Sequence, residues 1–219
     1  MSIRHDKVVA LSRMMDFEHE SLYMTCFEYE QELYKKSCLM KVVNKRIRNC
    51  ECCKGLNIKA FTESVIGFGT LNARIFFIGI SPGIPCMATQ IPFSGGSGYM
   101  LDAALRLSGL TRENIFISNI IHCHPDKNRQ PTPEEIRHCI HFLIQELQII
   151  KPALVVTLGT TPRDIVVKYD VMKGLDCKLH SVKHPASFLH SSLIGSKDWV
   201  IKLSILMDKF KGVPVANDK

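Results

Sequence analysis

The stretch Arg74-Ile-Phe-Phe-Ile-Gly-Ile80 decides the fold expected for this chain. A short apolar run that does not alternate with polar residues, and that ends at a glycine, is typical of a strand buried on both faces of a parallel sheet. Further strands are predicted over 114–121 and 153–158, and helices over 99–108, 162–169 and 197–211. Strands that alternate with helices predict an α/β fold, a three-layer α/β/α domain with a central, mostly parallel sheet.

The helix that begins after Thr132 has the clearest start signal. Thr132 can cap the helix, Pro133 suits its first position, and Glu135 can return a hydrogen bond to the cap. Four apolar side chains then recur at helical spacing, which predicts the buried face of the helix: Ile136, Ile140, Leu143 and Leu147.

Four loops are expected to form the functional site, because ligands of such folds bind outside the carboxyl ends of the strands. They are the Gly/Pro/Ser-rich loop 81–98, the polar loop 122–131, the turn 159–162 and the segment after residue 182.

The composition is that of a globular protein. The chain has 219 residues, of which 46% are hydrophobic and 22% charged, which excludes a disordered or fibrous protein. It has no signal peptide and no apolar run of about 18 residues, so we expect a soluble, cytoplasmic monomer without a membrane partner. A formal net charge of +7 favours a polyanionic partner.

The first 45 residues differ from the rest. Apolar and aromatic residues recur at helical spacing over 16–39, which predicts one or two amphipathic helices. We interpret 1–45 as an N-terminal helical extension and 46–219 as the main domain. The basic run from Lys41 to Arg48 is interpreted as a solvated face.

Nine cysteines are many for a chain that is expected to stay reduced, where clustered thiols are more often metal ligands or reactive groups than disulfides. Four of them form two pairs, Cys50-x2-Cys53 and Cys123-x15-Cys139. One tight pair and one wide pair suit a cubane iron–sulfur cluster better than a zinc ribbon, although a zinc site stays open. Cys139 could instead be an ordinary buried residue, and Cys52 competes with its neighbours as a ligand.

Two sets of motifs carry a resemblance to a known family. Gly79-Ile80-Ser81-Pro82-Gly83, followed by Pro92-Phe93-Ser94-Gly95, Gly98 and Leu101-Asp102, resembles the first signature of the uracil-DNA glycosylase superfamily. The run from Asn119 to Cys139, with its four-cysteine pattern, is similar to that of the iron–sulfur families 4 and 5. Val156-Thr157-Leu158-Gly159 and His184-Pro185-Ala186 match the closing motifs, so the resemblance covers about Cys50 to His190.

The resemblance implies a DNA glycosylase, a monofunctional hydrolase that cuts the N-glycosidic bond of a flipped-out uracil or 5-modified pyrimidine and leaves an abasic site. It implies DNA as the partner. It also implies a [4Fe-4S] cluster, with a structural role, on four ligands: Cys50, Cys53, Cys123 and Cys139.

Site roles also follow from the resemblance. Phe93 would stack on the base in a pocket that Ile80 lines, Asn119 would read the Watson–Crick edge, and His184 would hold O2 as the leaving base becomes negative. The backbone at Gly83 and Ser187 would grip phosphates, and Phe188 or Leu189 would fill the gap in the duplex. Phe93 could instead be core and Asn119 a turn cap. His122, His124 and His190 are interpreted as solvated loop residues or phosphate contacts.

The first motif departs from most of the superfamily. Family 4 has Glu at the position of Ile80, and family 1 has a water-activating Asp at the position of Ser81; here 79–99 contains no Asp or Glu. Catalysis would therefore depend on Asn119 and His184, with Ser81 orienting water without deprotonating it.

Small and apolar residues over 84–90 could leave space beside C5 of a pyrimidine. An enzyme dedicated to hydroxymethylated or glycosylated bases of phage DNA in antiviral defence is therefore one alternative. A non-catalytic protein that binds DNA or an unusual base is another.

Overall fold

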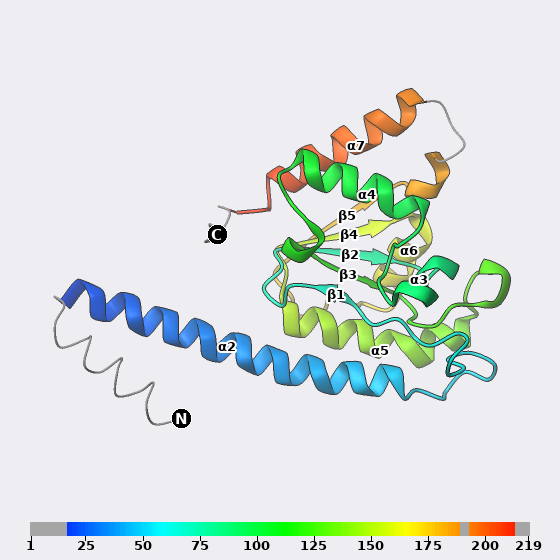
Figure 1. Ribbon diagram of the computed structural model, residues 1–219, viewed down its shortest axis with the longest axis horizontal. Helices are drawn as coiled ribbons and strands as arrows, with labels where there is room; N and C mark the ends of the chain where they lie inside the picture. Colours follow the sequence, from blue (N-terminus) through cyan, green and yellow to red (C-terminus); the bar gives the residue numbers. More distant parts are fainter. Residues whose placement is uncertain (1–16, 189–192, 213–219) are drawn as a thin grey trace. The chain divides into compact units, whose positions relative to one another are not determined.

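A computed structural model describes residues 17–188 and 193–212, and its core is a five-stranded sheet in the order β1-β3-β2-β4-β5 (Figure 1). The strands are β1 (Phe68–Gly69), β2 (Ile75–Gly79), β3 (Phe116–Asn119), β4 (Leu154–Leu158) and β5 (Lys178–Val182). β1 runs antiparallel to β3, and every other pair is parallel. The carboxyl ends of four strands therefore lie at the same end of the sheet.

The helices are α2 (Phe17–Arg48), α3 (Ile84–Thr89), α4 (Gly96–Leu107), α5 (Pro133–Ile150), α6 (Thr160–Lys168) and α7 (Leu193–Asp208). Three short 3-10 turns, η1 (Arg112–Asn114), η2 (Asp126–Asn128) and η3 (Pro185–Phe188), lie between them. The chain divides into two compact units after Cys38, so the first unit holds the greater part of α2 and the second holds the sheet.

Helices cover both faces of the sheet (Figure 1). Successive residues of a strand point to opposite faces, so Phe77 packs with α4 and α7, whereas Phe76 and Ile78 pack with α5 and α6. This arrangement confirms the predicted three-layer α/β fold.

The predicted start of α5 is also confirmed. Glu135 N–H donates to the Thr132 hydroxyl at 3.2 Å, and Thr132 N–H donates to the Glu135 carboxylate at 2.8 Å. All four residues predicted for its inner face are buried.

The sequence prediction was incomplete elsewhere. It placed α3 inside a loop, and it missed the short edge strand β1 and the partly exposed edge strand β5. The strand predicted over 114–121 is shorter, because η1 precedes it; pairing with the β2 segment nevertheless continues through the hydrogen bond from Ile120 N–H to Gly79 C=O at 2.9 Å. Among the described residues, no helix is long and apolar enough to cross a membrane.

Candidate active site

The site is built where β2 and β3 end side by side. Gly79 and Asn119 are register partners, and Asn119 is 1% exposed. A Cβ atom added to Gly79 would lie 2.7 Å from the ring of Phe93 and would also meet the amide oxygen of Asn119. The missing side chain of Gly79 therefore brings the predicted stacking ring and the predicted base-reading amide together.

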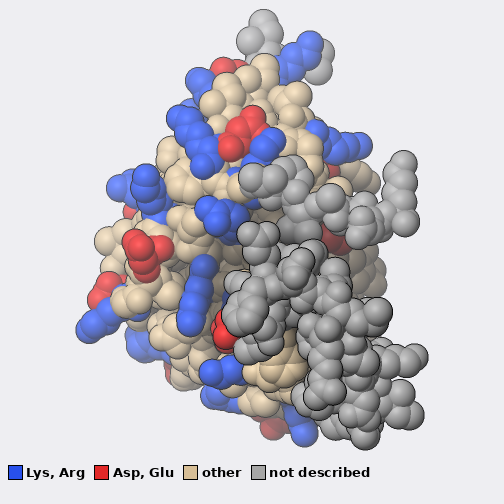
Figure 2. Space-filling view, turned by 90° about the vertical axis from the view of Figure 1, so that its left-hand side faces the viewer, with Lys and Arg blue, Asp and Glu red and all other residues tan. Residues whose placement is uncertain are grey.

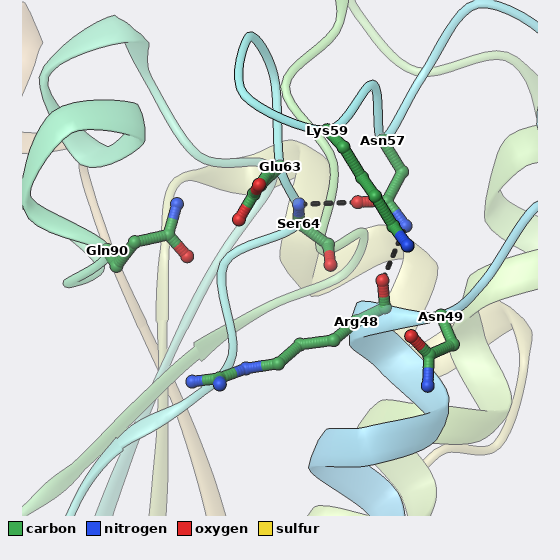
Figure 3. Close-up of a pocket in the computed structure, with 7 residues that line it drawn as sticks. All are labelled: Arg48, Asn49, Asn57, Lys59, Glu63, Ser64 and Gln90. Atoms are coloured by element: carbon green, nitrogen blue, oxygen red, sulfur yellow. Dashed lines mark hydrogen bonds between the residues drawn. The ribbon is translucent and has the colours of Figure 1, made fainter.

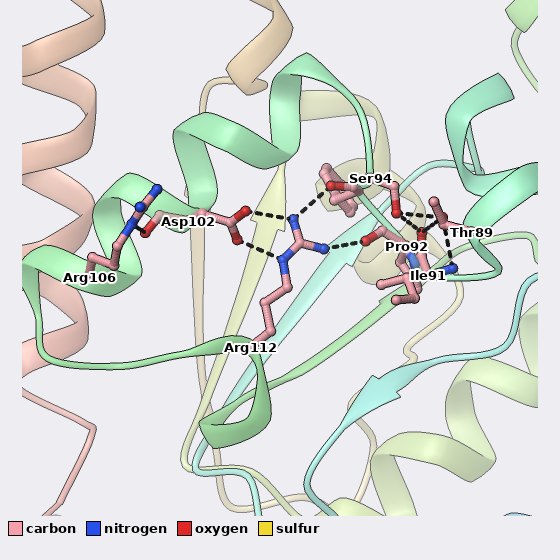
Figure 4. Close-up of polar contacts among 8 residues, drawn as sticks. Thr89, Ile91, Pro92, Ser94, Asp102, Arg106 and Arg112 are labelled. Atoms are coloured by element: carbon pink, nitrogen blue, oxygen red, sulfur yellow. Dashed lines mark hydrogen bonds and ion pairs between the residues drawn. The ribbon is translucent and has the colours of Figure 1, made fainter.

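Arg112 holds Phe93 in an uncommon conformation. Phe93 has a φ of 59°, in the left-handed region that an aromatic residue seldom adopts. The Arg112 guanidinium donates to the carbonyls of Pro92 at 2.8 Å and Phe93 at 2.7 Å, and it pairs with the Asp102 carboxylate at 2.6 Å (Figure 4). Asp102 of α4 thus orients the arginine that holds the loop at Phe93.

Gly98 completes this support. A Cβ atom at Gly98 would run into the Phe93 carbonyl group and would lie 2.7 Å from the Arg112 guanidinium. Only glycine allows the first turn of α4 to approach the Phe93 backbone so closely.

His184 faces the same space from the segment after β5. Its ring centroid lies 6.1 Å from that of Phe93, with the planes at 34°. Burial lowers the pKa of His184, which favours the neutral imidazole. Its Nδ1 accepts a hydrogen bond from Ala186 N–H at 3.1 Å, so the proton of the neutral ring is on Nε2, which can then donate to a ligand.

A cavity of about 240 Å³ opens beside His184. Its wall includes Ile80, which was predicted to line the base pocket, and Ser187, which was predicted as a phosphate contact. Gln130 and Lys183 also line it, and no role was predicted for either. Both missed residues are next to predicted motifs, but nothing in their spacing distinguishes them from solvated loop residues.

One polar atom in the site lacks a partner. The Asn119 amide oxygen is buried and has no hydrogen bond within the described part of the chain. Leaving a buried acceptor unpaired costs about 1–3 kcal/mol, so this atom is available for a ligand donor. Asn119 is thus not held as a turn cap through this oxygen.

The interpretation of two histidines as solvated loop residues or phosphate contacts was wrong. His122 is 1% exposed, donates from Nδ1 to Val65 C=O at 2.9 Å, and has its pKa lowered to about 4 by burial. His124 is 7% exposed and donates from Nδ1 to Pro82 C=O at 2.8 Å, which anchors the loop that follows β2. His190 lies outside the described residues.

The predicted DNA-contacting residues are placed as follows. Ser81 and Gly83 are half-buried in the loop after β2. Ser187 N–H already donates to His184 C=O at 3.0 Å, which leaves its hydroxyl rather than its amide for a phosphate. The Phe188 ring packs against Trp199, 6.4 Å between centroids, and Leu189 is outside the described residues.

The four paired cysteines influence one another. Burial raises the pKa of Cys123 to about 12, and the neighbouring thiols of Cys50 and Cys53 add to the rise. Burial also raises the pKa of Cys139, and the thiols of Cys123, Cys50 and Cys53 add to the rise. Cys50 is half-buried whereas Cys52 is exposed, and burial favours Cys50 over Cys52 as the partner of the buried wide pair.

Within the described ranges, no group of three or more His, Cys, Asp or Glu side chains is arranged to hold a metal ion. Four cysteine thiolates are the ligand set that a [4Fe-4S] cluster takes, so the chemistry of this donor set fits a cluster. The backbone N–H of His122 donates to the Cys139 sulfur at 3.3 Å, a contact that also stabilises a cluster thiolate.

Fold and site together define an α/β protein in which an aromatic ring, a buried amide with an unpaired oxygen and an imidazole lie near the carboxyl ends of the parallel strands. A family model for the uracil DNA glycosylase superfamily matches residues 66–203. The chain therefore belongs to this superfamily, as its motifs predicted.

Two groups of relatives are similar to the chain. The type-4 uracil-DNA glycosylase of Thermotoga maritima is 41% identical over 129 residues, which cover 59% of this chain and 66% of that protein. That of Archaeoglobus fulgidus is 30% identical over 169 residues, 69% of this chain and 85% of that protein. The type-5 enzyme of Thermus thermophilus is 30% identical over 143 residues, 58% of this chain and 64% of that protein. The chain thus spans just under two thirds of the length of the first and the third.

Proposed function

We propose that the protein is a monofunctional DNA glycosylase that hydrolyses the N-glycosidic bond of uracil in DNA and leaves an abasic site. The observation that carries this proposal is the unpaired, buried amide oxygen of Asn119 beside the Phe93 ring. A base inside a duplex is out of reach of these buried side chains, so the substrate nucleotide must be flipped into the site.

The chain's own groups account for the chemistry. Phe93 stacks on the base, and the Asn119 amide oxygen accepts from N3–H of uracil. As the glycosidic bond breaks, negative charge grows on O2, where the Nε2–H of neutral His184 donates. The loop after β2 has no carboxylate, so Ser81 orients the water and leaving-group stabilisation carries most of the rate enhancement.

We further propose that Cys50, Cys53, Cys123 and Cys139 hold a [4Fe-4S] cluster. When bound, the cluster supplies a structural link, because hydrolysis transfers no electrons. Its ligands come from the segment after α2, the segment after β3 and α5.

DNA as the partner agrees with the charge, since Lys and Arg total 28 against 21 Asp and Glu. Figure 2 shows that basic side chains also cover the face at the amino ends of the parallel strands, which is the side away from the candidate site, so the positive charge is not confined to the site. Neutralising phosphates with such side chains provides most of the affinity for DNA. Action as a monomer in the cytoplasm stays a prediction.

A 5-modified pyrimidine is the second candidate substrate. The α3 segment beside the site has no acidic residue in its first turn, and its Ile84 is 61% exposed, so a substituent at C5 would meet apolar rather than charged groups. Use of this activity against phage DNA, and base binding without catalysis, remain the alternative hypotheses.

Base release from oligonucleotides that contain uracil, thymine, 5-hydroxymethyluracil or 5-hydroxymethylcytosine tests the proposal. We expect uracil release, measured as alkali-labile strand breaks, and its loss in Asn119→Ala and His184→Ala. Binding without release from any of the four substrates would leave the protein as a non-catalytic binder. Release of uracil alone would remove the modified-base candidate.

A further inference from the structure

A second cavity, of about 230 Å³, lies outside the base pocket (Figure 3). It is bounded by the end of α2, by the segment between Cys53 and Val65, and by Gln90 at the end of α3. Figure 3 shows the Arg48 side chain reaching from α2 towards Gln90 and the Lys59 side chain crossing in front of Asn57. Neither the sequence motifs nor the proposed chemistry uses this cavity.

The cavity presents unused positive charge. No ion pair joins the side chain of Arg48 or Lys59 to another described residue, and both are exposed. One carboxylate, that of Glu63, also lines the cavity, and it already accepts from Ala60 N–H at 3.0 Å. The lining therefore carries a net charge of +1, and the Asn49 side-chain amide offers a further donor.

Hydrogen bonds join the backbone segments around these side chains. Asn57 donates to Arg48 C=O at 3.1 Å and to Cys50 C=O at 2.7 Å, and its own oxygen accepts from Ser64 N–H at 2.7 Å. The Ser64 hydroxyl donates to Ile47 C=O at 3.1 Å. These bonds tie the end of α2, which carries Arg48, to the loop that carries Lys59.

The cavity is linked to the base pocket on two sides. Gln90 belongs to the loop that ends in Phe93, and Val65 N–H donates to His122 C=O at 2.8 Å, three residues after Asn119. Gln90, which lines the cavity, thus lies three residues before Phe93, and Ser64, which also lines it, is next to the residue bonded to the segment that follows Asn119.

We propose that the cavity lined by Arg48 and Lys59 binds a backbone phosphate of the DNA strand that carries the flipped nucleotide. The inference rests on the proposed function for its ligand. A phosphodiester has the charge and the acceptor oxygens that an arginine, a lysine and an amide recognise together.

The test measures binding of the cluster-containing full chain to a duplex with an abasic-site analogue, over a range of salt concentrations. For one lost phosphate contact, the slope of log K against log salt should become shallower by about 0.9 in Arg48→Gln/Lys59→Gln. Lys173→Gln is the matched control for the single charge removed in Lys59→Gln, because Lys173 is exposed near the amino end of β5, away from the carboxyl ends of the strands where the site lies. An unchanged slope in the double variant, or an equal change in the control, would overturn the proposal.

A second measurement locates the phosphate. Duplexes that carry one neutral methylphosphonate at successive positions should show one position where the parent loses affinity and the double variant does not. Absence of such a position contradicts the proposal. Because Arg48 is close to Cys50, the iron content of the double variant is measured. Lys59→Gln alone, at an exposed position, should show part of the same loss of phosphate dependence. If the parent binds but releases no base, the proposed function fails while the binding result still decides the cavity.

Discussion

Gly79 determines the dimensions of the site at the scale of single residues. Its lack of a side chain allows Asn119 and the Phe93 ring to approach each other at the ends of two paired strands. The roles predicted for Asn119 and Phe93 came from the resemblance of their motifs to those of the glycosylase superfamily, and the fold places both residues at the ends of β2 and β3. The dependence of their approach on Gly79 could not be predicted from sequence, because the register of β2 and β3 is a property of the folded sheet.

Gly79→Ala should reduce uracil release by about a hundredfold or more, because displacing a stacking or hydrogen-bonding group by about 1 Å has effects of that size. Single-turnover rates measure the loss. Thermal unfolding of the same variant is the control: if it unfolds well below the parent's temperature, the loss reflects misfolding instead. A variant with parental rates would show that Phe93 and Asn119 need not be adjacent.

The pH dependence of base release reports on His184. Its pKa is lowered by burial, so the neutral, Nε2-protonated ring persists as pH falls through the ordinary histidine value of about 6.5. We expect the rate to stay level to below pH 6.5 and then to fall as the ring becomes protonated and Ala186 N–H loses its acceptor. His184→Gln, a neutral donor that does not titrate, should remove this acid limb; an acid limb of the same midpoint in that variant would assign it to another group.

At the scale of elements, residues from other elements hold the loop between β2 and α4 in place. The arginine at the start of η1 binds the Phe93 and Pro92 carbonyls and an α4 carboxylate, so three separate elements determine one ring position. The same loop is fastened internally where the Thr89 and Ser94 hydroxyls meet at 2.6 Å (Figure 4).

Arg112→Lys should weaken base release more than it weakens the fold. Lysine cannot reproduce a planar fork that reaches two carbonyls and a carboxylate, so about 1–3 kcal/mol of support for the loop is lost. Denaturant unfolding and release rates, measured together, separate the two effects. Arg106→Lys, on the exposed side of α4, is the matched control and should leave both unchanged.

Elements with strong local signals could be predicted, and those defined by tertiary pairing could not. Apolar β2 and β4 and the capped α5 were evident in the sequence. β5 was missed because its residues Lys178 and His180 are exposed, which breaks the apolar run, and β1 because two residues give no pattern. Arg112 was missed for the same reason, since its partners are backbone carbonyls that only the folded loop brings near.

At the scale of the whole molecule, the four paired cysteines come from three segments that are far apart in sequence. A cluster on them would fasten the chain after α2 to the end of β3 and to α5. The stability of the fold would then depend on the cluster, whereas the hydrolysis of the N-glycosidic bond would not.

Cys139→Ser should lose the visible absorption of the cluster and lower Tm, because removing one ligand of a structural metal site removes its contribution to folding. Cys177→Ser is the control, since Cys177 is half-buried and is not among the thiols that influence one another at Cys123 and Cys139. If the parent protein is colourless and contains zinc but no iron, the site holds zinc and the cluster proposal is wrong. If the two variants have equal Tm values, the proposed structural role of the cluster is wrong.

Glu146 makes stability depend on pH. Burial raises its pKa from about 4.5 to about 8, so the folded chain keeps a proton that the unfolded chain releases. Stability should therefore fall as pH rises towards 8. His122 lies 3.9 Å from Glu146, and its pKa is lowered in the folded chain. Its protonation therefore changes stability only below about pH 6.5, so the change in stability between pH 6.5 and 8 reports on Glu146 rather than on His122.

Urea unfolding in that window should show a decline of about 1–2 kcal/mol. Glu146→Gln should flatten the decline, because glutamine can still accept from the Ser118 hydroxyl but cannot ionise. A decline of the same size in Glu146→Gln would assign it elsewhere.

The two edges of the sheet carry a consequence for aggregation. Strands as apolar as β2 and β4 add readily to similar strands of another chain when their edges are free. Here both lie inside the sheet. One edge is β1, which pairs at only two residues and whose Gly69 has a φ of 130°, and the other is β5, which begins with an exposed lysine. Neither edge presents a long, flat ladder, so the chain should remain dispersed at high concentration while its most adhesive segments stay enclosed.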